Sequence, residues 1–105
     1  MSITAKRITQ DVVITGASQS ETTESIMGRI DQLIIVASAT RIFNLILTND
    51  QDQEIYRAEG LNVDTTLHTL RPNILPMGTV TITIENPSTA SGTVIVVIIE
   101  KERES

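Results

Sequence analysis

One acidic cluster in this chain has a spacing that suits a hard cation, and it comprises Asn49, Asp50, Asp52 and Glu54. Calcium takes several carboxylate and carbonyl oxygens from loops of this kind. The EF-hand pattern is absent, because neither its glycine at the sixth position nor its glutamate at the twelfth is present. A solvated hairpin tip explains these residues equally well, so the sequence assigns no metal site.

The single histidine, His68, lies between a leucine and a threonine on a short expected strand. A catalytic histidine needs a nucleophile or an orienting acid nearby, and no Gly-x-Ser-x-Gly elbow accompanies it. Metal binding would need further ligands, but the chain has no second histidine and no cysteine. Glu21 and Glu24 are too isolated to form an acid/base pair. We therefore expect no enzyme, no catalytic residue and no cofactor.

Composition narrows the class of protein. With 105 residues the chain fits one domain, and 40% of it is hydrophobic but only 2% aromatic. The core must be built from Ile, Val and Leu, which favour strands. A net charge of −5 is the wrong sign for a nucleic-acid binder. No apolar run approaches the roughly 20 residues that span a bilayer, and no signal peptide is visible.

The last third of the chain contains two strand-like runs of opposite character. Residues 79–85 alternate threonine with aliphatic side chains, so one face of that strand is apolar. Residues 86–92 form a turn-rich connection, and the run that follows is apolar on both faces. Its two sets of side chains are Val94, Val96 and Ile98 on one face and Ile95, Val97 and Ile99 on the other. We expect one set to enter the core and the other to contact a neighbour or a covering segment.

The first 37 residues yield a less regular pattern. Residues 3–7 are an arm or a first strand, and residues 11–15 are a strand. Residues 16–25 are polar and are expected to form a long loop. Residues 26–37 are expected to form one strand bent near Gly28. A helix within residues 20–35 is the alternative, because Ile26, Ile30 and Leu33 have helical spacing.

The middle of the chain predicts a hairpin of residues 43–48 and 53–58, then a short strand at 65–70. The charged tail, residues 101–105, is expected to leave the sheet and fray. The sequence therefore predicts one all-β domain spanning residues 1–105, with a possible arm at residues 1–10. Its fold is an antiparallel β-sandwich of jelly-roll type with about seven or eight strands.

Two segments carry a resemblance to a known class of protein: residues 75–82, Leu-Pro-Met-Gly-Thr-Val-Thr-Ile, and the return strand at residues 92–96. Together with the Thr/Ile-rich strands, they resemble the small β-sandwich or jelly-roll cement or decoration proteins of tailed-phage capsids. The resemblance is one of architecture and covers residues 28–100. It implies a homotrimer or a homodimer that clamps neighbouring major capsid protein subunits on the exterior of the virion, and of the two we expect the trimer.

The resemblance also implies synthesis in the host cytoplasm, and the charge and composition described above lead us to expect neither nucleic acid nor a membrane as partner. The mildly basic start of the chain, with Ile3, Lys6 and Arg7, is the candidate arm that contacts the capsid. Two other classes stay open: another virion part, such as a head–tail connector, tail or fibre domain, and a ligand- or sugar-binding sandwich. Tyr56 beside Arg57 is a weak candidate for a sugar site. Carbohydrate-binding sandwiches generally present flat aromatic platforms, whereas this chain has one tyrosine and no tryptophan.

Overall fold

The computed structural model describes the backbone of residues 3–88 and 91–103, and the side chains of residues 7–88 and 91–100. The described backbone forms strands and no helix. In chain order the strands are β1 (Ile3–Val13), β2 (Ser18–Ile26), β3 (Arg29–Ala37), β4 (Arg41–Thr48), β5 (Glu54–Val63), β6 (His68–Leu70), β7 (Gly78–Glu85) and β8 (Thr93–Arg103).

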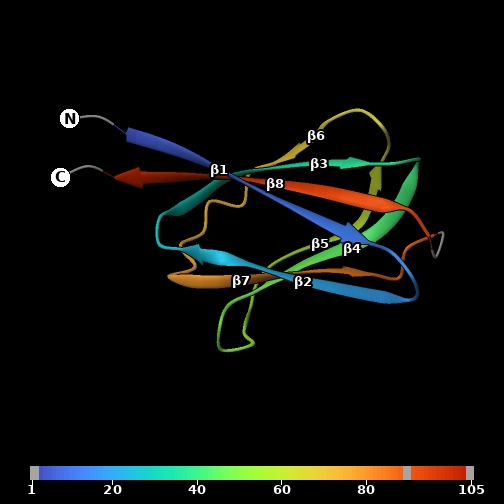
Figure 1. Ribbon diagram of the computed structural model, residues 1–105, viewed down its shortest axis with the longest axis horizontal. Coiled ribbons are helices and arrows are strands. Elements are labelled where there is room, and N and C mark those ends of the chain that lie inside the picture. The colour runs from blue at the N-terminus through green and yellow to red at the C-terminus, as the bar shows by residue number, and fades with distance from the viewer. Residues whose placement is uncertain (1–2, 89–90, 104–105) are drawn as a thin grey trace.

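The strands form two four-stranded antiparallel sheets that pack face to face (Figure 1). The order in the first sheet is β1-β8-β3-β6, and the order in the second sheet is β2-β7-β4-β5. The pairs β1·β8, β2·β7, β3·β6 and β4·β5 are successive steps of one long hairpin, and the β8·β3 and β7·β4 pairs close the rolled-up sheets. This is the connectivity of a jelly roll, so the predicted fold class is confirmed.

Aliphatic side chains from both sheets fill the space between them, as the strand periodicity requires. Residues of β7 alternate between buried and half-buried along the whole strand, as predicted. On β8, Val94, Val96 and Ile98 are fully buried, whereas the three residues that follow them in alternation are half-buried. Both aromatic side chains belong to this interior: Phe43 is buried, and Tyr56 packs against the core from β5.

The prediction of a loop at residues 16–25 is wrong, because strand β2 occupies Ser18–Ile26. This strand lies at the edge of the second sheet, and only Thr23 and Ile26 on it are buried. It therefore lacks the apolar alternation that marks a half-buried strand.

The prediction of one bent strand over residues 26–37 is also wrong. The chain turns at Met27 and Gly28, so that β2 belongs to the second sheet and β3 to the first. The alternative helix within residues 20–35 does not form. The short strand β6 covers only the last half of the predicted residues 65–70.

Both ends of the described chain lie in the first sheet. Strand β1 runs without interruption from Ile3, and its register with β8 has no shift from Ile3↔Arg103 to Val13↔Thr93. Residues 101–103 thus continue β8, although the sequence predicted a tail that leaves the sheet; residues 104–105 lie outside the described part. Strands β1 and β8 extend side by side past the end of the second sheet (Figure 1), and beyond the Arg29↔Lys101 pair they form a two-stranded ribbon of residues 3–4 and 102–103.

Candidate functional site

The outer face of the second sheet is mostly polar, with Ile42 (48% exposed) and the buried Ile46 of β4 as its aliphatic members, and its polar side chains pair with one another. Hydroxyl groups face one another across β2 and β7: Ser20 Oγ lies 2.9 Å from Thr83 Oγ1, and Thr22 Oγ1 lies 3.0 Å from Thr81 Oγ1. Such cross-strand hydroxyl pairs stabilise a sheet whose face is in water. The threonine side of the alternating strand is therefore a solvated face.

Charged side chains on the same face pair with one another around Arg57. Its Nε donates to Glu54 Oε1 at 2.9 Å, and Nη2 lies 2.8 Å from the same oxygen. Glu59 and Glu85 are more distant, at 3.7 and 3.8 Å from Nη1. The hydrogen bond to Glu54, reinforced by the three carboxylates, raises the pKa of Arg57 above its ordinary value. This arginine has its partners within its own chain.

The outer face of the first sheet is different, because an aliphatic stripe crosses its two central strands. The stripe residues lie on β8 and β3 and are all half-buried: Ile95, Val97, Ile99, Ile34 and Val36. Nothing in the described part of the chain covers this stripe, since the other sheet packs against the opposite face. We call these five residues the aliphatic stripe.

Strand register arranges this face in rows. In an antiparallel sheet, directly opposite residues point to the same face. The middle row consists of Thr9 on β1, Val97 on β8, Ile34 on β3 and Thr69 on β6. The aliphatic residues thus lie at the centre of the row, and threonines lie at both sides.

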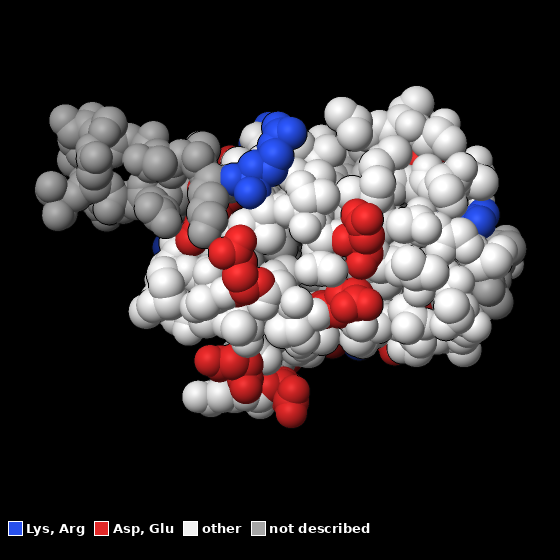
Figure 2. Space-filling model, in the orientation of Figure 1, with Lys and Arg blue, Asp and Glu red and all other residues white. Residues whose placement is uncertain are grey.

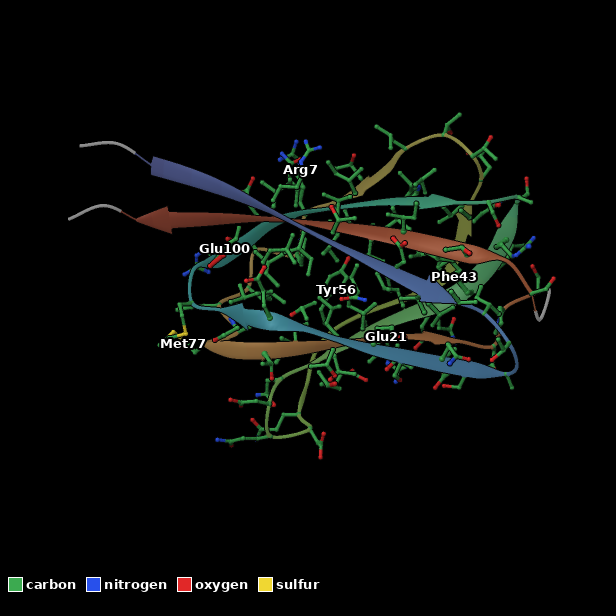
Figure 3. All side chains as sticks on the ribbon, viewed as in Figure 1. Arg7, Glu21, Phe43, Tyr56, Met77 and Glu100 are labelled. Carbon is green, nitrogen blue, oxygen red and sulfur yellow. The ribbon has the colours of Figure 1, made fainter. Side chains whose placement is uncertain are left out.

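The rows on either side of the middle row carry opposite charges at the β1 edge. One row contains Arg7, Ile99 and Gln32, and the other contains Asp11, Ile95 and Val36. The Arg7 and Asp11 side chains are exposed, and neither has an ion-pair partner among the described residues. Figure 3 shows Arg7 pointing away from the second sheet.

The expected packing strand therefore divides as its periodicity indicated. Val94, Val96 and Ile98 enter the core, while Ile95, Val97 and Ile99 form most of the aliphatic stripe. What the sequence reasoning missed is the contribution of β3. Residues 33–37, Leu-Ile-Ile-Val-Ala, are also apolar on both faces, and this same signal could have identified Ile34 and Val36.

The candidate arm residues belong to strand β1. Backbone pairs join Ile3 to Arg103, Lys6 to Glu100 and Arg7 to Ile99. The side chains of Ile3 and Lys6 lie outside the described residues, whereas Arg7 is exposed beside the aliphatic stripe. The register thus places Ile3 in the projecting ribbon and Lys6 and Arg7 in the body of the first sheet, where β8 also pairs with β3.

A second exposed apolar group lies at the end of the sandwich from which the ribbon projects. The register Ile26↔Gly78 brings Met27 and Met77 to the same end of the second sheet. Their exposed fractions are 57% and 55%, and Leu75 nearby in the chain is 49% exposed. Figure 3 shows Met77 at this end of the molecule. We call Met27, Leu75 and Met77 the methionine end.

The acidic cluster forms the tip of the β4–β5 hairpin, and Figure 2 shows acidic side chains on this projecting loop. Asn49 organises the tip, because its Oδ1 accepts from the backbone N–H groups of Gln51 and Gln53, both at 2.9 Å. Glu54 pairs with Arg57 instead of turning into the loop. Among the described residues no group of three or more His, Asp and Glu side chains could hold a metal ion.

His68 is a half-buried residue of β6, opposite Ile35. Nearby, Asp64 Oδ1 accepts hydrogen bonds from the hydroxyl and the backbone N–H of Thr66, at 2.5 and 2.8 Å. These bonds lower the pKa of Asp64 below its ordinary value, and the His68 charge contributes a smaller effect in the same direction. This arrangement is a turn stabilised by its own side chains.

No protein-family model and no curated protein sequence matches the chain. Among solved structures, TmCBM61 in complex with β-1,4-galactotriose is 15% identical, with a TM-score of 0.45 over 90% of this chain and 69% of that one. A chain from the structure of the infectious bursal disease virus Gx strain is 11% identical, with a TM-score of 0.42 over 95% of this chain and 30% of that one. Yersinia pseudotuberculosis-derived mitogen is 11% identical, with a TM-score of 0.40 over 97% and 89%. No described helix is long and apolar enough to span a membrane.

Proposed function

We propose that this protein is a structural virion protein that binds the outer surface of a phage capsid, as a homo-oligomer, and cements neighbouring coat subunits. The observation that carries the proposal is the distribution of exposed apolar surface on a small jelly roll. One sheet presents the aliphatic stripe, one end presents the methionine end, and the opposite sheet face is mostly polar apart from Ile42. Exposed apolar patches rimmed by polar residues are typical of protein–protein contacts.

The methionine end supplies the surface that docks on the coat protein in this proposal. Met27 and Met77 are flexible, polarisable side chains that adapt to an irregular partner surface. The β1–β8 ribbon projects from the same end, so it can reach across a subunit boundary (Figure 1). Of the candidate contact residues, Ile3 belongs to this ribbon, whereas Lys6 and Arg7 lie farther along β1, where β8 also pairs with β3.

A sugar-binding function has less support from the same side chains. Phe43 is 1% exposed, and Tyr56 packs against the core. These are the only two aromatic residues of the chain, so neither offers a flat platform on which a sugar ring could stack. A head–tail connector, tail or fibre role uses the same kind of surface, and the experiment below distinguishes it.

The test is reconstitution on expanded phage heads that lack the protein. Adding the wild-type protein should saturate sites on the heads and raise the temperature at which they release DNA. Met27→Gln combined with Met77→Gln should weaken binding by at least about tenfold, since two exposed apolar contacts are lost. Leu67→Gln is the matched control, because Leu67 is 72% exposed but is not part of the methionine end.

Heads that bind no protein, or that bind it without gaining heat resistance, would contradict the cementing role. Binding confined to connectors, tails or fibres would assign the protein to another part of the virion.

A further inference from the structure

We infer that the outer face of the first sheet docks on the same face of a second copy of this chain. The two copies are related by a two-fold axis that lies between the two faces and runs parallel to the middle row. The inference deepens the homo-oligomeric part of the proposed function, on which it rests, and names its partner. The occupant of the aliphatic stripe is thus another aliphatic stripe. The capsid-docking surface is a different one, the methionine end.

The apolar content of the face provides the attraction. Five half-buried aliphatic side chains lie on adjacent strands, with no charged residue among them. An antiparallel sheet with one face in water normally alternates apolar and polar residues, as β7 does. Strands β3 and β8 depart from this pattern over the same stretch. Packing of their outer face against the same face of another copy accounts for the departure.

The charges on the face are self-complementary, and this feature selects a second copy as the occupant. Rotation by 180° about the middle row exchanges the two flanking rows. Arg7 of one copy then faces Asp11 of the other, and Ile99 faces Ile95. By symmetry the Arg7–Asp11 pair forms twice in the dimer, and it uses charges that have no ion-pair partner among the described residues.

The same geometry favours a pair over the trimer that the sequence suggested. A surface that complements itself closes with two copies, because residue i contacts residue j while j contacts i. A cyclic trimer needs two different complementary patches on each copy. The outer face of the second sheet is a poor second patch, since its hydroxyl and charged groups are satisfied internally.

The experiment is sedimentation equilibrium of the purified protein and its charge variants, with no capsid present. The wild type should be a dimer at micromolar concentration. Arg7→Asp alone places two acids opposite each other, and Asp11→Arg alone places two arginines opposite each other. Each should weaken association by at least about tenfold, because like charges at an interface repel. The double variant restores opposite charges and should associate within about threefold of the wild type.

A second pair of variants tests the apolar part of the contact. Val97→Asp puts a charge on the axis and should leave a folded monomer, with the circular dichroism spectrum of the wild type. Thr83→Asp, at a half-buried position on the outer face of the second sheet, should leave the dimer intact. A wild-type monomer or trimer, or a dimer unaffected by Val97→Asp, would overturn the inference. Failure of the double charge swap to restore association would also overturn it, whereas absence of capsid binding would count only against the proposed function.

Discussion

Glu100 is the residue whose place in the molecule departs most from what its type suggests. Its side chain is 1% exposed, and Oε1 accepts a hydrogen bond from the backbone N–H of Gly28 at 2.8 Å. The carboxylate thus ties β8 to the turn between β2 and β3. Its other oxygen, Oε2, is buried with no hydrogen-bond partner among the described residues.

Removing this carboxylate should therefore destabilise the domain. Glu100→Ala leaves the partly buried N–H of Gly28 without its acceptor, and we expect a loss of about 1–3 kcal/mol in the free energy of unfolding. Glu100→Gln keeps an oxygen at the same position and should lose less than half as much. Urea denaturation of both variants measures the difference, and equal stability of the Ala and Gln variants would refute the role given to this hydrogen bond.

The inward position of Glu100 could be predicted from the sequence. Glu100 has the same parity as Val94, Val96 and Ile98, so continuation of the strand places it on the inward face. The charged residues that follow it, 101–105, predicted a frayed tail instead. Burying a carboxylate costs free energy unless a hydrogen-bond donor contacts it. The donor here is the backbone N–H of Gly28, which lies 72 residues earlier in the chain, so no local pattern reveals it.

At the scale of the strands and loops, Arg41 joins two connections at the end of the sandwich opposite the ribbon. Its Nε donates to the carbonyl of Ser91 at 2.9 Å, and Nη1 donates to the carbonyl of Thr40 at 3.1 Å. Gly92 lies directly against the guanidinium, because a Cβ built there would overlap Nη2 of Arg41. The end of the loop before β8 is therefore shaped by a buried arginine.

Gly92→Ala should destabilise the domain more than Gly60→Ala. Both glycines have a positive φ, of +105° and +62°, but a Cβ at Gly60 meets nothing within 4 Å. The Gly60 variant should therefore lose only the strain of a left-handed residue, about 1–2 kcal/mol. The Gly92 variant should lose at least about 1 kcal/mol more, because its methyl group also displaces Arg41. Thermal unfolding of the two variants makes the comparison, and equal losses would contradict this packing account.

Sequence patterns predicted strands well where the two faces of a strand differ or where both are apolar. Residues 79–85 and 94–99 were recognised for this reason. Strand β2 was missed because its stabilisation comes from pairing with β7, through contacts such as Thr22 Oγ1 to Thr81 Oγ1, and not from its own apolar residues. These two threonines are 59 residues apart in the chain, and no local pattern encodes that pairing.

The jelly roll gives this protein two outer sheet faces of different composition. Rolling one long hairpin places both ends of the described chain in the same sheet, where β1 and β8 run side by side. That sheet carries the aliphatic stripe, and the other carries the hydroxyl pairs and the Arg57 cluster. We infer that the face with the aliphatic stripe holds two copies together.

Crosslinking at a single introduced thiol tests this claim most directly, because the natural chain has no cysteine. Thr9→Cys places an exposed thiol on the middle row, where each copy faces the same residue of its partner. Packed sheets lie about 10 Å apart, beyond the Cα separation of roughly 7 Å that a disulfide tolerates, so a short bismaleimide is the suitable reagent. The matched control is Thr22→Cys, an exposed position on the outer face of the second sheet. The account predicts covalent dimers from the Thr9→Cys variant and only singly modified chains from the Thr22→Cys variant; equal crosslinking of both, or none at position 9, would contradict it.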